Sequence, residues 1–281
     1  MPAGLGLFRH FPGRGQSAIV FTDLDATLLE PDGSLLSEAA SLVRRLAQAE
    51  VSVVPVTSKT RLEVSDWLRR LRIPGPAIFE NGAGTVLGET VEISPSAVAC
   101  ASLLELLWHC SRETGVPVRP LTEMSEDELE RLTGLSPREQ AGARSREYTL
   151  PFLAETDDLA PLRRSLQSTG RVAIVKGGRF WHLMGLHSKA DFFARVRGHC
   201  GAWGTTLGLG DAPNDIPILA AVDRPAIIRG EAGHAPELVE RFPAAYRTAE
   251  RAGAGWVEAI SELVPPELSG RLGGRGVSGS E

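Results

Sequence analysis

Two pairs of aspartates, each at the end of an apolar run, are the residues of this 281-residue chain best suited to chemistry. Asp23 and Asp25 follow the run that begins at Ala18, and side-chain alternation along a strand would point both the same way. Asp211 and Asp215 follow a second such run. Neighbouring carboxylates repel one another, so the four need a cation or a shared proton. Gathered at one edge of a sheet, they predict a hard-cation site that suits Mg²⁺ and a bound phosphate.

Each acidic pair also has a purely structural explanation. The first pair could form a turn capped by its own side chains, and Asp215 could cap a helix expected at Ile216–Ala221. Asp211 lies on the loop itself, so helix capping explains it less well. The presence of two acidic strand ends in one chain favours a shared site.

Two further groups fit a phosphate. Thr57 and Ser58 end another apolar run, where a hydroxyl and a backbone N–H can hold phosphoryl oxygens, although a helix cap is the alternative. Lys189 can neutralise charge on a transferring group. Of the 30 basic residues only Lys59, Lys176 and Lys189 are lysines, which marks positions where the wide fork of arginine does not suffice.

The surrounding pattern is that of an α/β protein. Short apolar runs alternate with helical stripes, as in a doubly wound, mainly parallel sheet. The elements expected in the first part are Ala18–Asp23, Ser37–Ala49 with Ser37 as N-cap, Val51–Val56, Val64–Leu71 and Ala77–Phe79. The same rhythm returns after Lys189, with elements expected at Ala190–Arg197, Thr205–Leu209, Ile216–Ala221 and Pro225–Ile228.

Residues 89–187 break this rhythm and are expected to form an inserted α+β cap domain. Helices are expected at Ala97–Arg112, Ser125–Leu132, Ser136–Ala143 and Leu159–Ser168, and strands at Arg146–Leu150, Arg171–Lys176 and Phe180–Met184. Gly177-Gly178 between the last two strands is a hairpin signal. The catalytic core is therefore expected at 17–88 and 188–265, with a flexible extension at 1–16 and a disordered tail at 266–281.

Composition narrows the class of protein. The formal net charge of −5 argues against nonspecific nucleic-acid binding, and no apolar run approaches the ~20 residues that span a bilayer. The N-terminal residues lack the apolar segment of a secretory signal. Cys100, Cys110 and Cys200 have no CxxC spacing, which argues against a disulfide framework or a thiolate zinc site. We expect a cytoplasmic monomer or homodimer that binds a small molecule, not nucleic acid or a membrane.

Together the motifs resemble the haloacid dehalogenase superfamily of phosphatases. Its four motifs are matched in order by Asp23-Leu-Asp-Ala-Thr27, Thr57, Lys189 and Gly210-Asp-Ala-Pro-Asn-Asp215, and the resemblance covers residues 17–265. The insert is similar to the C2B α+β cap of the Cof-type subgroup. Four finer signatures resemble the mannosyl-3-phosphoglycerate phosphatase family, which includes members acting on the glucosyl analogue. These signatures are Val54–Arg61, Phe79–Gly82, Arg146–Tyr148 and Gly178–His182.

The chain departs from the family pattern at two positions. Ala26 stands where glycine is usual, and its β-carbon raises the cost of a positive φ after Asp25. Ala212 stands where serine is common, which removes one hydrogen bond near Asp211. Neither departure removes a carboxylate.

The resemblance implies a role for each motif residue. Asp23 would be the nucleophile that forms an aspartyl-phosphate, and Asp25 would protonate the leaving oxygen and then activate water. Mg²⁺ would be held by Asp23, the backbone carbonyl of Asp25, and Asp211, with Asp215 orienting the metal shell. The phosphoryl oxygens would be held by Thr57, Lys189 and Asn214.

The rest of the substrate is expected to face the insert, where a glycosyl phosphoglycerate needs partners for a carboxylate and for sugar hydroxyls. The candidate substrate-binding residues are Ser58, Arg61, Glu80, Asn81, Gly82, Arg146, Lys176, Gly177, Gly178, Arg179 and Asn214. Arg61 could instead be solvated and Arg179 could pair across strands, while Lys59 is expected to brace its loop. His182 and His187 are expected in the core or at the surface, because Mg²⁺ prefers oxygen ligands.

The resemblance thus implies a Mg²⁺-dependent phosphatase that hydrolyses mannosyl-3-phosphoglycerate, glucosyl-3-phosphoglycerate or both, yielding a compatible solute. Two alternatives remain within enzymes, another Cof-type sugar phosphatase and a phosphosugar mutase. A non-enzyme alternative is a glycosyl-phosphate binding protein that lost turnover because Ala26 replaces the usual glycine.

Overall fold

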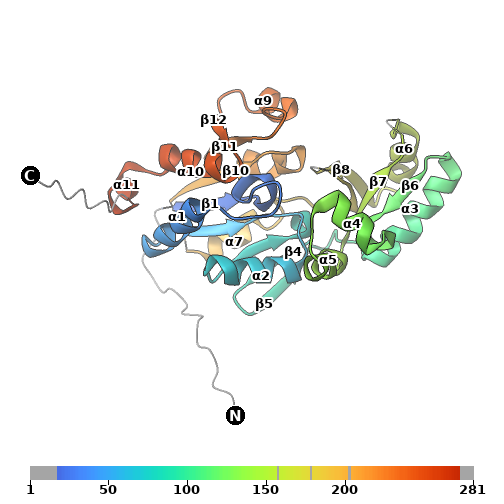
Figure 1. Ribbon diagram of the computed structural model, residues 1–281, viewed down its shortest axis with the longest axis horizontal. Coiled ribbons are helices and arrows are strands. Elements are labelled where there is room, and N and C mark those ends of the chain that lie inside the picture. Colours follow the sequence, from blue (N-terminus) through green and yellow to red (C-terminus); the bar gives the residue numbers. More distant parts are fainter. Residues whose placement is uncertain (1–17, 157, 178, 202–203, 273–281) are drawn as a thin grey trace, which may run out of the picture.

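A computed structural model describes residues 18–156, 158–177, 179–201 and 204–272 of the chain. The expected extension at 1–16, the end of the expected tail from residue 273, and Gly178 lie outside this range. Figure 1 shows a core of β1, β2, β10, β11 and β12 with flanking helices, and a second lobe that carries α3, α6 and β6–β8. Among the described residues, we find no helix with the length and apolar character needed to traverse a lipid bilayer.

A five-stranded parallel sheet forms the centre of the core, in the order β12-β11-β10-β1-β2. Its strands are β1 (Ala18–Thr22), β2 (Ser52–Pro55), β10 (Thr205–Gly210), β11 (Arg224–Arg229) and β12 (Tyr246–Arg251). Every residue of β1 is buried, which explains its unbroken apolar sequence. Thr22 of β1 pairs with Leu209 of β10, so the two acidic loops leave the sheet side by side.

Helices cover both faces of this sheet, as a doubly wound fold requires. Leu46, Trp256 and Leu268 belong to the cluster on one face, and Phe21 and Val196 to the cluster on the other. The first cluster draws on α1 (Ser37–Gln48), α2 (Arg61–Leu71), α10 (Ala252–Leu263) and α11 (Pro266–Leu272). The remaining core helices are α7 (Phe193–His199), α8 (Ile216–Ala221) and α9 (Pro236–Arg241). The predicted α/β fold class is confirmed.

A small antiparallel sheet extends the core next to β2. It consists of β3 (Ala77–Phe79), β4 (Gly84–Leu87) and β5 (Thr90–Ile93). A parallel bridge between Val56 and Ile78 places β3 beside the end of β2. The insert was expected to begin at residue 89, but β5 pairs with β4 and so completes this small sheet.

The second lobe, here called the cap, is built on an antiparallel sheet of order β6-β7-β9-β8. Its strands are β6 (Val118–Pro120), β7 (Thr149–Ala154), β8 (Val172–Lys176) and β9 (Trp181–Gly185). Its helices are α3 (Cys100–Thr114), α4 (Glu126–Thr133), α5 (Pro137–Arg144) and α6 (Ala160–Ser168). α3 and α6 cover one face of the sheet, and α5 lies beside α2 of the core (Figure 1). β8 and β9 form the predicted hairpin.

Three local predictions are wrong. Ser37 is the first residue of α1 and does not cap it, because Leu36 occupies the cap position. The strand expected at Arg146–Leu150 begins only at Thr149. The disorder expected from residue 266 does not apply to 266–272, because Leu268 and Leu272 of α11, four residues apart on one helix face, are buried in the core.

Candidate active site

Three aspartates from the two acidic loops meet at the carboxyl ends of β1 and β10. One carboxylate oxygen each from Asp23, Asp211 and Asp215 lies within 4.8 Å of the others. Asp23 is 5% exposed and Asp215 is fully buried. The edge of an open α/β sheet where this cluster lies is the usual place for a ligand. The convergence predicted from the two loops is therefore present.

Lys189 connects two members of the acidic cluster. Its Nζ lies 3.0 Å from Oδ2 of Asp23 and 2.6 Å from Oδ1 of Asp215. The side chain is fully buried. Burial opposes the charge on Lys189, but Asp215 and Asp23 outweigh that effect and raise its pKa. A solvated position for Lys189 is thereby excluded.

Asp215 braces the loop on which Asp211 lies. Its Oδ2 accepts hydrogen bonds from the backbone N–H groups of Asp211 (3.0 Å) and Ala212 (3.1 Å). A β-carbon on Gly210 would approach the carboxyl of Asp215 within 2.4 Å, so only glycine fits there. Asp215 occupies the N-cap position of α8, as the structural alternative expected, but its side chain makes no capping bond to that helix and bonds the acidic loop instead.

The cluster carries more negative charge than its lysine balances. Burial raises the pKa of Asp23 to about 7; the charge of Lys189 opposes this, and Asp215 adds to it. Burial, with Asp215 and Asp23, also raises the pKa of Asp211. A divalent cation would offset the repulsion between these carboxylates and would favour the ionised form of Asp23 and Asp211. The donor set is entirely oxygen, as Mg²⁺ prefers, so these residues fit such an ion.

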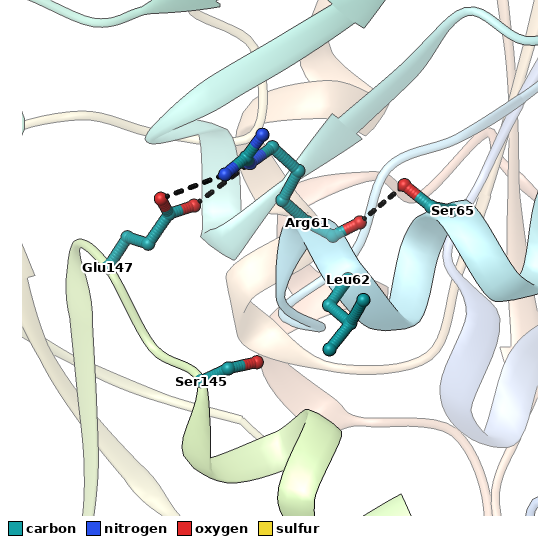
Figure 2. Close-up of a pocket in the computed structure, with 5 residues that line it drawn as sticks. All are labelled: Arg61, Leu62, Ser65, Ser145 and Glu147. Atoms are coloured by element: carbon teal, nitrogen blue, oxygen red, sulfur yellow. Dashed lines mark hydrogen bonds and ion pairs between the residues drawn. The ribbon is translucent and has the colours of Figure 1, made fainter.

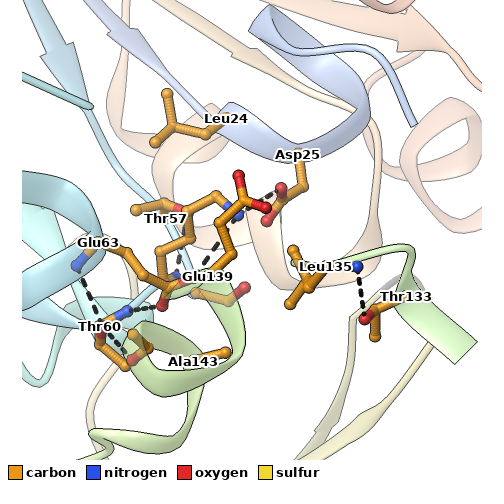
Figure 3. Close-up of polar contacts among 12 residues, drawn as sticks. Leu24, Asp25, Thr57, Thr60, Glu63, Thr133, Leu135, Glu139 and Ala143 are labelled. Carbon is orange, nitrogen blue, oxygen red and sulfur yellow. Dashed lines mark hydrogen bonds and ion pairs between the residues drawn. The ribbon is translucent and has the colours of Figure 1, made fainter. Parts of the chain in front are cut away.

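Asp25 does not belong to this acidic cluster. Its Oδ1 lies 2.7 Å from Nζ of Lys59, and its side chain is 48% exposed. Immediately after Asp25 the backbone turns at Ala26, which adopts a φ of 54°. Figure 3 shows the carboxylate of Asp25 directed toward the loop that carries Thr57 and Thr60. The only metal-ligating group of Asp25 that stays a candidate is therefore its backbone carbonyl.

The loop after β2 is held from several sides. Thr57 is fully buried, and its Oγ1 accepts a hydrogen bond of 3.2 Å from the backbone N–H of Lys59. Thr60 caps α2, with its Oγ1 accepting from Glu63 N and the Glu63 carboxylate accepting from Thr60 N. Since Thr60 fills the capping role, the capping alternative for Thr57 and Ser58 is wrong.

Asn81 and Asn214 form a pair beside the acidic loop. Asn214 Nδ2 donates to Asn81 Oδ1 over 3.1 Å. Asn81 Nδ2 and Asn214 Oδ1 are buried and have no hydrogen-bond partner within the described chain. This position places Asn81 next to a residue expected to hold the phosphoryl group, not among the residues of the cap.

Glu80 ties the core to the cap. Its buried carboxylate accepts hydrogen bonds of 2.7–2.9 Å from the backbone N–H groups of Glu147, Tyr148 and Thr149 and from Oγ1 of Thr149. In this arrangement the carboxylate is bound to the cap, and the expectation that Glu80 receives a sugar hydroxyl stays a prediction. In this arrangement it positions the segment that precedes β7.

Two other candidate substrate residues have structural contacts. A β-carbon on Gly82 would lie 1.8 Å from the carbonyl oxygen of Ser188, so this glycine lets the loop of Lys189 approach. The guanidinium of Arg146 donates to the carbonyl of Ser58 (2.5 Å), to the carbonyl of Ala143 and to Thr149 Oγ1. The bond from Arg146 to Ser58 joins the cap to the core, whereas Gly82 and Ser188 both belong to the core.

Arg61 lines a surface cavity of about 380 Å³ between α2 and the segment after α5, together with Leu62, Ser65, Ser145 and Glu147. Its guanidinium donates to both carboxylate oxygens of Glu147, over 3.1 and 3.2 Å (Figure 2). The Arg61 side chain is exposed to solvent, but its guanidinium is paired with a cap carboxylate and so is not free for a substrate anion in this arrangement.

The hairpin of β8 and β9 carries the remaining candidates and lies close to Pro213–Asp215. Lys176 Nζ lies over the ring of Trp181, 4.8 Å from its centroid, and donates to the carbonyl of Arg179. Gly177 closes the turn by donating its N–H to Phe180 O. Arg179 is exposed, and Gly178 is not among the described residues.

Two contacts in the site were not anticipated as such. Thr27 Oγ1 donates to Asp211 Oδ1 over 2.9 Å, and nothing in the spacing of these residues signals it. The ion pair of Lys59 with Asp25 was not predicted, although the small number of lysines had singled out Lys59. Its contacts with Asp25 and Glu63 agree with the expected role of Lys59 in bracing its loop.

Comparisons with known proteins agree with the fold. Residues 20–107 match a haloacid dehalogenase-like hydrolase family. A glucosyl-3-phosphoglycerate/mannosyl-3-phosphoglycerate phosphatase of Persephonella marina is 29% identical over 268 residues, covering 88% of this chain and 97% of that protein. A Methanococcoides burtonii protein of the same name is 28% identical, with 88% and 97% covered. The structure of Thermoplasma acidophilum 0175 aligns with a TM-score of 0.66 and 19% identity, covering 86% of this chain and 96% of that one.

Proposed function

We propose that this phosphoric monoester hydrolase, which is similar to the haloacid dehalogenase-like hydrolases, acts on a glycosyl-3-phosphoglycerate. The glucosyl and mannosyl compounds are both included in this proposal. The substrate is suggested by the names of the two relatives, and the observation that carries the phosphoryl-transfer chemistry is the buried contact of Asp23 with Lys189 beside Asp211 and Asp215. That cluster supplies a carboxylate nucleophile and the charges that phosphoryl transfer requires.

The proposed reaction has two steps. A carboxylate oxygen of Asp23 attacks phosphorus, and the bond from phosphorus to the leaving oxygen breaks as Asp25 donates its proton to that oxygen. Asp25 then takes a proton from water, whose oxygen attacks phosphorus and frees Asp23 and inorganic phosphate. Between the steps the phosphoryl group is bound to Asp23 as an acyl phosphate, a mixed anhydride.

Lys189 and the neighbouring hydrogen-bonding groups hold the transferring group. Lys189 carries its positive charge in a water-excluded site, where electrostatic stabilisation is strong. The unpartnered amide atoms of Asn81 and Asn214, and the buried Thr57, suit the phosphoryl oxygens. The proposal extends the role expected of Asn214 to Asn81.

Asp23, Asp211 and the backbone carbonyl of Asp25 would hold Mg²⁺, with Asp215 bracing the loop. When bound, the ion would supply charge neutralisation at the phosphoryl oxygens. We propose that the reaction takes place in the cytoplasm, where the three free cysteines would stay reduced.

The test is phosphate release from glucosyl-3-phosphoglycerate, mannosyl-3-phosphoglycerate and a panel of simple sugar phosphates. A preference of at least tenfold in kcat/KM for one or both glycosyl phosphoglycerates supports the proposal, and an equal or higher rate on a simple sugar phosphate refutes it. Isomerised phosphosugar without free phosphate would identify a mutase. Binding without single-turnover release would identify a binding protein.

A further inference from the structure

The cap sheet has one face against its own helices and one face toward the core. Leu183 of β9 is fully buried in the cluster formed with α3 and α6, and Trp181 packs against the same cluster. Alternation along the strand places His182 on the opposite face. Thr149, which bonds Glu80 of the core, lies opposite Met184 on that same face. The face that carries His182 therefore looks onto the catalytic core.

His182 is a buried polar side chain without an evident structural partner. It is 5% exposed, and its Nδ1 is buried and has no hydrogen-bond partner in the described residues. Its cross-strand neighbours, Pro151 and Val175, have apolar side chains. The other ring nitrogen, Nε2, lies against Gly177, where an added β-carbon would come within 2.9 Å. A buried polar atom left unpaired costs free energy, so this nitrogen calls for a ligand.

The surroundings of His182 are positively charged. Burial, followed by the charges of Arg146, Lys189 and Lys176, lowers the pKa of His182 to about 3. The imidazole is thus neutral, and one lysine near it is the residue that contacts Asp23. Three cations around a neutral hydrogen-bonding group favour the binding of an anionic oxygen. Because the phosphoryl oxygens already have other binding residues, this oxygen would belong to a second anionic group of the substrate.

We propose that His182 is a substrate-binding residue whose Nδ1 hydrogen-bonds a carboxylate on the leaving group of the phosphomonoester. This inference rests on the proposed function, since a phosphoglycerate ester carries that carboxylate next to the phosphate. Arg146 and Lys176 supply the surrounding positive potential, while their own donors engage backbone oxygens. His182 then selects substrates with an acid group and contributes nothing to simple phosphate esters.

The test compares His182→Leu and His182→Asn with Met184→Leu, a control on the same face of the same strand. Leucine removes the hydrogen-bonding atom at similar size, whereas the amide of asparagine restores a polar atom near the position of Nδ1. Glucosyl-3-phosphoglycerate is compared with glucosylglycerol phosphate, which lacks the carboxylate, and with p-nitrophenyl phosphate. All variants are checked by thermal unfolding.

His182→Leu should lower kcat/KM for the carboxylate substrate by about ten- to a hundredfold, mainly through KM, and leave the other two substrates within twofold. His182→Asn should recover much of this loss, and Met184→Leu should match wild type. Equal losses on all substrates, or no loss on any, overturn the inference.

A second measurement separates this inference from the proposed function. Inhibition of p-nitrophenyl phosphate hydrolysis by 3-phosphoglycerate and by glycerol 3-phosphate needs no turnover of a glycosyl substrate. The wild-type protein should bind 3-phosphoglycerate at least tenfold more tightly than glycerol 3-phosphate. The His182→Leu variant should bind the two compounds equally well. An equal preference in wild type and His182→Leu overturns the role of His182, whatever the natural substrate is.

Discussion

Lys59 and Asp25 form an ion pair, with Nζ and Oδ1 2.7 Å apart, although they lie on loops that follow two different strands. Burial opposes the charge of Lys59, but Asp25 and Glu63 raise its pKa. The contact holds the carboxylate of Asp25 against the loop that carries Thr57 and Thr60. The proposed acid and base of the reaction thus has a defined position before substrate arrives.

Lys59→Met should lower kcat by about tenfold with a smaller effect on KM, because Asp25 would lose the contact that orients it. Lys59→Arg should retain part of the rate. Steady-state kinetics with the preferred substrate measures both, with Arg69→Met, an exposed position on α2, as the control. A kcat at or above that of wild type would mean that Lys59 sequesters Asp25 and does not orient it.

Metal binding should strengthen as pH rises toward about 7, because the pKa of Asp23 in the metal-free protein is raised to about 7 by burial and the cation must displace that proton. We expect the apparent Kd for Mg²⁺ at pH 5.5 to exceed that at pH 7.5 by about tenfold or more. Calorimetric titration measures this. A Kd that is independent of pH would contradict the proton displacement.

The raised pKa of Asp23 also predicts how the stability of the metal-free protein depends on pH. An aspartate in the unfolded chain titrates near 3.8 and Asp23 in the folded chain near 7, so the folded state binds more protons between these values. The free energy of unfolding should therefore fall as pH rises from about 4 to 7. Asp23→Asn, which should also abolish turnover, should show a weaker fall. Urea unfolding at several pH values in EDTA is the measurement.

Ala26→Gly should stabilise the protein slightly. Alanine at a φ of 54° costs about 1–2 kcal/mol relative to glycine, offset by the greater freedom of glycine in the unfolded chain. We expect a net gain of about 0.5 kcal/mol in the free energy of unfolding. Ala26→Val should instead destabilise, since a branched side chain suits this conformation less well. An unchanged stability in both variants would show that the backbone relaxes at this position.

Glu80→Gln should loosen the connection between core and cap. Its carboxylate accepts four hydrogen bonds from Glu147, Tyr148 and Thr149, and an amide would place N–H groups against some of these donors. We expect a loss of about 2–4 kcal/mol in stability, measured by urea unfolding. Glu89→Gln, at an exposed position, is the control. A loss no greater than in the control would show that these bonds contribute little.

The parts of the site that follow from strand ends were predictable from sequence. Asp23 and Asp211 each follow a buried apolar run, and parallel strands bring their carboxyl ends to one edge. The side-chain contacts between lobes were not predictable in this way. Glu80 and Arg61 look like free polar groups in the sequence, but their partners, Thr149 and Glu147, lie more than sixty residues away and are brought near only by the packing of the cap.

For His182, too, burial was predictable from the sequence but the contacts between cap and core were not. An isolated histidine within the apolar run of β9 indicates burial, and the structure confirms that it is buried. Its relation to Lys189 and Arg146 depends on which face of the cap sheet meets the core, and strand alternation alone leaves that face undecided. The α11 helix was missed for a similar reason, since its two leucines become apolar contacts only once the core face exists to receive them.

The depressed pKa of His182 yields a further prediction on acid stability. Histidine in the unfolded chain titrates near 6.5, whereas burial and the neighbouring cations lower the pKa of His182 to about 3 in the folded chain. Between these values the unfolded state binds more protons, so the stability present above pH 6.5 is lost as pH falls toward 3, by up to about 1.4 kcal/mol per unit. His182→Asn removes this contribution, so its free energy of unfolding should fall less steeply below pH 6.5 than that of wild type. His109→Asn, at an exposed position on α3, serves as the control in urea unfolding from pH 7.5 to 4.5. Parallel curves for wild type and His182→Asn would show that the imidazole is protonated in the folded chain, and the neutral, cation-facing environment inferred for it would then be wrong.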